Sequence, residues 1–256
     1  MDWMKYRLLY LLISAVVIGM GLYSFSRWGL NLSIDFTGGT IVEYQMKSDG
    51  SRFTERKGPV RQDEVVRGDA EIVRFESVGP TFSAEIFKKT LIAVAIAAGG
   101  ILLWIAWQFR SLQFGISAIL AAAHDVLVLL GSFALFGHVW GAPIDTLFVT
   151  ALLTTLAFSV HDTIVVFDRI RESKKKFGGS IYELANMAIS QTMVRSLNNS
   201  LTVVFVLVAL VLLGGETLKW FSVALLVGIV TGTYSSPFVA VPLLVTWEEV
   251  KKRFRR

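Results

Sequence analysis

The chain has 256 residues, of which 54% are hydrophobic and 18% are charged, and its mean hydropathy is +0.58. Soluble domains carry about 25% charged residues, so this composition excludes an ordinary cytosolic globule. The chain has no cysteine, which excludes disulfides, thiol catalysis and cysteine-ligated metals. Three histidines leave little room for a histidine-rich metal site.

Six long apolar segments follow one another along the chain. They cover residues 8–25, 91–109, 114–136, 147–167, 197–213 and 220–245. A helix needs about 20 residues to cross the hydrocarbon layer, and each segment is near that length. The apolar runs are continuous and do not alternate with polar residues, which favours helices over barrel strands. We expect an α-helical membrane protein with six transmembrane helices.

The first apolar segment follows Lys5 and Arg7, as the core of a secretory signal peptide would. Its apolar core is longer than that of a signal peptide, and no small-x-small cleavage motif follows it. We therefore expect an uncleaved membrane anchor.

Lysine and arginine residues gather in the segments that a cytoplasmic N-terminus would place inside the cell. These residues are Lys5, Arg7, Arg110, Arg169, Arg171, Lys174, Lys175, Lys176, Arg195, Lys251, Lys252, Arg253, Arg255 and Arg256. The two short outer loops carry Lys219 alone. The positive-inside rule therefore predicts that both termini are cytoplasmic.

Residues 27–89 form the one sizeable polar segment outside the spans, with equal numbers of basic and acidic residues. A neutral segment of this kind predicts no nucleic-acid partner. Alternating apolar residues predict a strand over 30–36, a turn at 37–40 and a second strand over 42–46, which together make a hairpin. A short helix over 61–67 and a strand over 71–78 complete a small α+β domain between the first two spans.

These features divide the chain into three parts. Residues 1–26 hold a cytoplasmic tail and the first helix, residues 27–89 the extracytoplasmic α+β domain, and residues 90–256 a five-helix transmembrane region. The last part includes a cytoplasmic loop at 168–195, with an amphipathic helix over 182–193, and a basic C-terminal tail.

Two aspartates lie inside apolar spans, where ionisable side chains are rare and usually functional. Asp125 is near the middle of the third span, and Asp162 is nearer the inner end of the fourth. Each shares a helix face with small or polar residues: Ser117, Ala121 and Ser132 for Asp125, and Thr155, Ser159 and Thr163 for Asp162. These two stripes are expected to meet each other or a partner protein.

An aspartate that gains and loses a proton at this depth can serve as a proton relay, and burial is expected to raise a carboxyl pKa toward neutrality unless a cation pairs with it. The alternative is a hydrogen-bonded residue that only holds helices together. His124 and His161 precede the two aspartates and are further relay candidates. His124 points about 100° away from Asp125 around the helix, so a contact between them does not follow from the sequence.

Other motifs have a structural or an open interpretation. Gly228-x-x-x-Gly232 in the sixth span permits close helix packing. Gly38-Gly39 is expected to supply positive φ angles rather than to bind phosphate. Arg169 and Arg171 at the inner end of the fourth span are interfacial anchors or functional residues.

No nucleotide-binding, zinc-protease or serine-hydrolase motif occurs in the chain. The sequence contexts of intramembrane aspartyl proteases are also missing around the two aspartates. We therefore expect no enzymatic activity, no metal site and no cofactor.

Several sequence blocks occur in order along the chain: Ile34-Asp35-Phe36-Thr37-Gly38-Gly39-Thr40, Val78-Gly79-Pro80, Phe109-Arg110, His124-Asp125, 162–172 (including Asp168, Arg169, Arg171 and Glu172), Gln191-Thr192, Arg195-Ser196 and 228–236. In these blocks the chain resembles the SecF family, the smaller membrane subunits of the bacterial SecD–SecF export complex. One departure is His161, which stands where the family usually has asparagine.

The resemblance implies a subunit that uses the proton motive force to assist late export of polypeptides, with Asp125 as its relay aspartate. It implies SecD, the SecYEG channel, the translocating polypeptide, membrane lipids and, indirectly, SecA as partners in a bacterial cytoplasmic membrane. The resemblance also implies membership of the resistance-nodulation-division superfamily. Two alternatives stay open: half of a proton-driven lipid or small-molecule exporter of that superfamily, and a passive scaffold protein.

Overall fold

The computed structural model describes residues 2–109 and 111–254. Arg110, Arg255 and Arg256, which contribute to the predicted orientation, lie outside the described residues. Six helices are long and apolar enough to cross a membrane within the described chain, as the sequence predicts. They are α1 (Arg7–Trp28, after a short 3-10 turn at Trp3–Tyr6), α3 (Pro80–Phe109), α4 (Leu112–Trp140), α5 (Thr146–Phe177), α6 (Ile181–Leu213) and a last span that joins α7 (Glu216–Ser235), a π-helical turn (Ser236–Ala240) and α8 (Val241–Phe254).

The helices are longer than the apolar segments that predict them. The expected cytoplasmic loop at 168–195 is instead the end of α5 and the start of α6, joined only by residues 178–180. Ser180 caps α6 by accepting a hydrogen bond from Glu183 N at 3.3 Å, and Glu172 pairs with Lys176 one turn further along α5 at 2.8 Å. Such pairs extend a helix beyond the lipid, where hydropathy no longer marks it.

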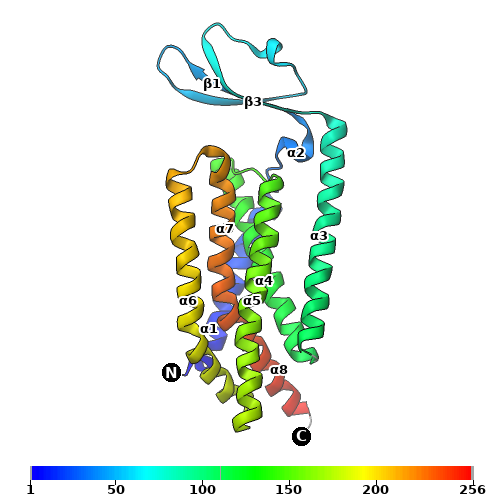
Figure 1. The fold of residues 1–256 in the computed structure, drawn as a ribbon, viewed down its shortest axis with the longest axis vertical. Coiled ribbons are helices and arrows are strands. Elements are labelled where there is room, and N and C mark those ends of the chain that lie inside the picture. The colour runs from blue at the N-terminus through cyan, green and yellow to red at the C-terminus, as the bar shows by residue number, and fades with distance from the viewer. Residues whose placement is uncertain (1, 110, 255–256) are drawn as a thin grey trace.

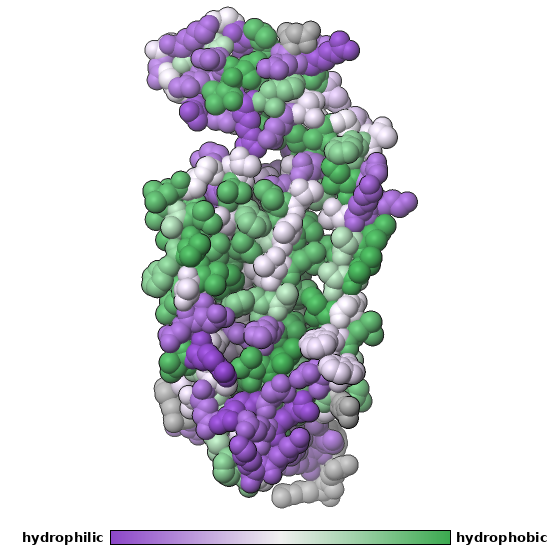
Figure 2. Space-filling model, viewed as in Figure 1, coloured by the Kyte–Doolittle hydropathy of each residue, from purple (hydrophilic) through white to green (hydrophobic). Residues whose placement is uncertain are grey.

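Helices α1, α4, α5, α6 and α7 form a bundle, and α3 stands at its side (Figure 1). Apolar residues cover the middle of the molecule between hydrophilic residues at both ends (Figure 2). At the crossing of α1 and α4, Gly21 faces Gly131 so closely that a Cβ on Gly21 would lie 3.0 Å from Gly131 Cα. The bundle therefore relies on small residues where helices meet, as membrane helices generally do.

A three-stranded antiparallel sheet lies at one end of the bundle (Figure 1). Its central strand is β1 (Gly39–Met46), flanked by β2 (Arg52–Lys57) and β3 (Ala70–Val78), in the order β2-β1-β3. The sheet's small core contains Val42, Tyr44, Val65 and Ala70. A 3-10 turn at Gln62–Val65 occupies the region of the predicted short helix, and β3 confirms the predicted strand over 71–78.

The predicted strand over 30–36 is wrong. Ile34–Thr37 forms the short helix α2, and Leu32 makes only an isolated bridge to Ile144, so the hairpin joins β1 to β2 instead. Leu30, Leu32 and Phe36 pack against the apolar core at the nearby end of the bundle. Their alternation comes from packing against the bundle and not from a sheet.

Candidate functional site

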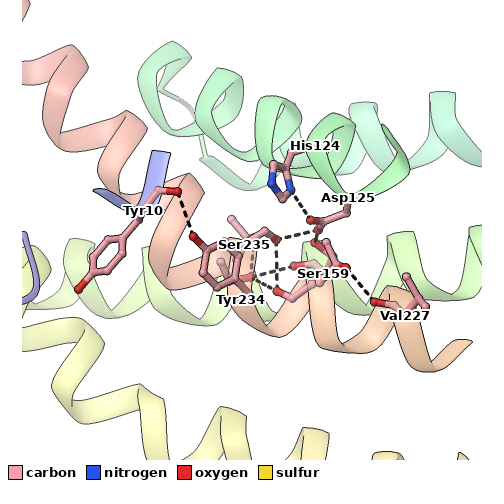
Figure 3. A network of polar contacts seen from close by, with 11 residues as sticks. Tyr10, His124, Asp125, Ser159, Val227, Tyr234 and Ser235 are labelled. Atoms are coloured by element: carbon pink, nitrogen blue, oxygen red, sulfur yellow. Dashed lines mark hydrogen bonds and ion pairs between the residues drawn. The ribbon is translucent and has the colours of Figure 1, made fainter. Parts of the chain in front are cut away.

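Asp125 lies at the junction of α4, α5 and α7, and only 6% of its surface is exposed (Figure 3). Ser235 Oγ donates a hydrogen bond to its Oδ2 at 2.7 Å, and Ser159 Oγ donates to the same oxygen. His124 Nδ1 lies 2.9 Å from its Oδ1, a contact that the helical spacing alone does not predict. The carboxyl group thus has partners on all three helices.

A second set of hydroxyl groups lies beside this junction. Ser236 Oγ is 3.0 Å from Thr163 Oγ1 and also reaches the carbonyl oxygen of Ser159 at 3.3 Å. Ser235 and Ser236 stand where the regular helix α7 passes into the π-helical turn, which contains Pro237. Proline cannot donate a backbone hydrogen bond, and π-turns are frequent at functional sites.

Gly228 and Gly232 bring α7 against α5. A Cβ on Gly228 would lie 2.8 Å from Thr155 Oγ1, and one on Gly232 would lie 3.0 Å from Ser159 Cβ. Side chains at these two positions would push the helices apart. The glycines therefore allow hydroxyl groups from both helices to reach the same carboxyl group.

Asp162 lies on the same helix as Ser159 but faces α6. It is 5% exposed and accepts a hydrogen bond from Ser196 Oγ at 2.6 Å. The structure therefore places the two aspartates in separate polar contacts that share α5. His161 is exposed, and its side chain forms no hydrogen bond within the described residues.

The charged run at the other end of α5 forms its own network. Arg169 bonds Gln191 Oε1 at 2.5 Å and Glu172 at 2.6 Å. Asp168 accepts hydrogen bonds from Arg171 and from Gln108 of α3, each at 3.1 Å. These hydrogen bonds connect α3, α5 and α6 at the end of the bundle away from the sheet.

The outer glycine motif connects the sheet to the start of α5. Asp35 accepts hydrogen bonds from the backbone N of Thr146 at 3.2 Å and from its hydroxyl at 3.0 Å. Asp145 caps the same helix by accepting from Phe148 N at 2.7 Å. Burial raises the pKa of the Asp145 carboxyl group, the bond from Phe148 lowers it, and the charge of Asp35 raises it again.

The rest of this motif shapes the turn into β1. Phe36 lies edge-on to Phe87 of α3, with ring centres 5.8 Å apart. Gly38 and Gly39 have φ angles of 70° and 118°, as expected. A Cβ on Gly39 would lie 2.8 Å from the carbonyl oxygen of Lys57, so only glycine fits beside β2.

Sequence reasoning assigned no role to Ser196, Ser235, Ser236 or Thr146, which bind the aspartates or their partners. Two of them follow one another directly before a proline inside an apolar span, and that grouping is the signal that could have found them. Within the described residues, no group of three or more His, Cys, Asp or Glu side chains could hold a metal ion.

Six long apolar helices, with carboxyl groups buried between them, define a multi-pass membrane protein. The family model described as "Protein export membrane protein SecD/SecF, C-terminal" matches residues 61–250, and the SecD/SecF GG motif matches residues 29–49. The chain belongs to the SecD/SecF family of protein-export membrane proteins.

Named relatives agree with this assignment. The protein translocase subunit SecF of Thermobaculum terrenum is 40% identical over an alignment 307 positions long, which covers 100% of this chain and 97% of that protein. Subunit SecDF of Thermus thermophilus is 34% identical, over 94% of this chain and 37% of its own length. The relatives support a role as a subunit in SecD–SecF protein translocation and do not favour the exporter alternative.

Two solved structures have the same fold. The crystal structure of SecDF from Thermus thermophilus superposes with a TM-score of 0.86 at 29% identity, over 97% of this chain and 39% of that one. SecDF in its "Super-membrane-facing form" gives a TM-score of 0.76 at 31% identity, over 100% and 40%. The chain therefore spans about two fifths of the length of these SecDF proteins.

Proposed function

We propose that this chain couples proton movement through its transmembrane helices to protein export, in a complex with a SecD-like partner. The observation that carries the proposal is the burial of Asp125 between α4, α5 and α7, with hydroxyl donors from two of these helices. The role we infer is mechanical and not catalytic.

Protonation of Asp125 changes the hydrogen bonds that its neighbouring side chains can form. The ionised carboxylate accepts hydrogen bonds from Ser159 and Ser235 at one oxygen. A protonated carboxyl group carries a donor of its own. A proton on Oδ2 would displace one of the two hydroxyl donors and so change the contact between α5 and α7, whereas a proton on Oδ1 would be donated toward His124 Nδ1 of α4.

Helix α5 provides a route from this change to the sheet. Its start is fixed to the outer motif through Asp35 and Thr146. Asp162, one turn further along α5 from Ser159, connects the same helix to Ser196 of α6. A shift of α5 would therefore act on both the sheet and α6.

The energy available suits a change between two conformations. One charge that crosses the membrane field releases about 2.3 kcal/mol per 100 mV. Reversing a 1:99 equilibrium needs about 5.5 kcal/mol. A few protons per cycle can therefore bias a domain movement, whereas they cannot unfold a stable protein.

The distribution of basic residues supports an orientation with both termini in the cytoplasm and the sheet outside, in a bacterial inner membrane. The relatives named SecDF support SecD as the partner. We extend the assembly to the SecYEG channel, to SecA indirectly and to the translocating polypeptide, because the family serves protein export.

The surface of α5 and α6 offers a place for the SecD-like partner. Thr150, Thr154 and His161 are exposed along α5, and Asn198 and Asn199 are exposed on α6. Hydrophilic side chains also interrupt the apolar belt over the part of α6 away from the sheet (Figure 2). Polar side chains avoid lipid, so a partner helix is the expected neighbour.

The test is export by vesicles that hold this chain with its SecD partner, measured with and without a proton gradient. We expect Asp125→Asn to fold, to co-purify with the partner and to lose the stimulation by the gradient. Ser132→Ala is the control, because this hydroxyl group bonds only the carbonyl oxygen of Val128 on its own helix.

The variant Asp162→Asn distinguishes the contribution of Asp162 to the stimulation from that of Asp125. Loss of stimulation in both variants would support a path through both carboxyl groups. Normal stimulation in Asp125→Asn together with its loss in Asp162→Asn would contradict the role of Asp125 and leave the Asp162–Ser196 contact as the relay.

A further inference from the structure

The second ring nitrogen of His124, Nε2, is buried and has no hydrogen-bond partner among the described residues. The residue is 6% exposed, and its other nitrogen, Nδ1, lies 2.9 Å from the carboxyl group of Asp125. Native proteins usually satisfy a buried polar atom of this kind, often with an ordered water, because leaving it unpaired is costly. The proposed coupling gives Nε2 no role, so its surroundings were the place to look for one.

The packing of α1 on α4 follows a regular register. Gly21 of α1 meets Gly131 of α4 at their closest approach. Seven residues further along each helix, Trp28 stacks on His138 with ring centres 4.3 Å apart. The two pairs have the same separation along the chain, so α1 and α4 lie side by side and run in the same direction, toward the sheet (Figure 1).

This register places Ser14 of α1 opposite His124, because each lies seven residues before the glycine contact. Ser14 is 5% exposed, and its hydroxyl group is also buried without a partner in the described chain. The hydroxyl group of Tyr234 donates to the carbonyl oxygen of Tyr10 at 3.0 Å, one turn before Ser14, so α1 also touches the Asp125 network here (Figure 3). Two buried polar atoms without partners thus lie on the facing sides of α1 and α4.

A third hydroxyl group extends this line away from the sheet. Ser117 lies two turns before His124 on the same face of α4, is fully buried, and has no partner for its Oγ within the described residues. Toward the sheet, the hydroxyl groups of Ser24 and Ser132 instead donate to carbonyl oxygens of their own helices, at 2.9 and 2.8 Å. The unpaired polar atoms therefore lead from His124 toward the end of the bundle that holds both termini.

We infer that a buried water bridges Ser14 Oγ and His124 Nε2, and that Asp125 exchanges its proton with this water through the His124 ring. A water molecule can donate to Nε2 or accept from it, so it suits either tautomer of the ring. Ser14 is then a positioning residue, because it holds the water and does not touch the carboxyl group. The inference rests on the proposed role of Asp125 and adds the route by which its proton moves.

The exchange moves two protons by one bond each. A proton that arrives on the water as hydronium passes to Nε2, while the proton on Nδ1 passes to Oδ1 of Asp125. A water, a neutral ring and a neutral carboxyl group remain. Release of the proton reverses both transfers.

The test is hydrogen–deuterium exchange of the protonated Asp125 carboxyl group, followed by infrared spectroscopy on the full chain in lipid bilayers. The signal is the carboxyl stretching band that disappears in Asp125→Asn. We expect Ser14→Ala to slow the exchange about fivefold, because the water loses one of its partners. Ser24→Ala is the matched control: Ser24 is on the same side of α1 and is also 5% exposed, but it bonds only the carbonyl oxygen of Met20.

A second measurement follows the ring itself. Nitrogen-15 NMR of the labelled histidines should show a changed Nε2 signal for His124 in Ser14→Ala and an unchanged one in Ser24→Ala. The variant His124→Gln identifies the signal.

Equal exchange rates in the two serine variants would overturn the proposed route and leave the proposed coupling intact. An Nε2 signal that Ser14→Ala leaves unchanged would overturn it as well. If no carboxyl band depended on Asp125 at any pH, the proposed function itself would be contradicted, and the route with it.

Discussion

Gly228 lets α7 pack closely against α5, and these two helices carry the hydroxyl groups that bond Asp125. Gly228→Ala would place a methyl group within 3 Å of Thr155, and such overpacking costs about 1–3 kcal/mol. We expect a lower free energy of unfolding in denaturant titrations. Gly99→Ala is the control, because a Cβ at Gly99 meets nothing within 4 Å. Equal stability of the two variants would contradict the close approach of the helices.

The Asp145 carboxyl group should make the free energy of unfolding depend on pH. Burial raises the pKa of its carboxyl group above the ordinary value of 3.8, the hydrogen bond from Phe148 lowers it, and the charge of Asp35 raises it again. The folded chain thus holds this proton more tightly than the unfolded chain does. The resulting stability is complete below about pH 3.8 and is lost as the pH rises through the folded-state pKa.

Asp145→Asn should remove this part of the dependence, since asparagine can still cap the helix. The measurement is the free energy of unfolding against pH for both chains, and the difference between the two curves is the readout. Parallel curves over the acid range would show that the proton on Asp145 does not affect folding.

At the scale of elements, the Asp35 carboxylate connects α2 to the first residue of α5. Asp35→Ala removes the partner of the Thr146 backbone N–H and hydroxyl group. We expect faster hydrogen exchange in the first turn of α5, by about tenfold for the loss of one such cap. Asp49→Ala, in the turn between β1 and β2, is the control that should leave this exchange rate unchanged.

The six spans could be predicted because each contains an uninterrupted apolar run. The helix ends could not, because residues such as Glu172, Lys176 and Ser180 extend helices beyond the lipid by capping and charge pairing. The strand expected at 30–36 failed because its alternating residues pack on the bundle.

For the candidate site, burial of Asp125 and Asp162 followed from the cost of a carboxylate in lipid. The sequence also predicted that the polar faces of the third and fourth spans would meet each other or a partner protein, and Ser159 of the fourth span contacts Asp125 of the third. The partners Ser235 and Ser196 were not predicted, because contacts between residues 34 or 110 positions apart depend on how the helices pack.

At the scale of the whole molecule, both ends of the chain lie on the side of the bundle away from the sheet (Figure 1). Arg7 of α1 and Glu249 of α8 form a two-pronged ion pair there, with both distances 2.6 Å. The termini must therefore face the same side of a membrane, whichever side that is.

Single-cysteine labelling tests which side it is, and the chain has no cysteine to interfere. In intact cells, a thiol reagent that cannot cross the membrane should label Asp69→Cys, between β2 and β3. It should not label Lys252→Cys near the end of α8, which becomes reactive in inverted vesicles. The reverse pattern would overturn the proposed orientation.

Helix α5 is continuous over 32 residues, which corresponds to about 48 Å, well above the 30 Å of the hydrocarbon layer. This one helix thus carries the contact with Asp35 at its start, Ser159 and Asp162 along its length, and the charged run at Arg169 and Glu172. Thermodynamic linkage makes influence along such a helix reciprocal. If a ligand at one end of the helix favours one position of α5, then a ligand that binds the sheet and favours the same position must raise the affinity for the first ligand by the same factor that the first raises its own.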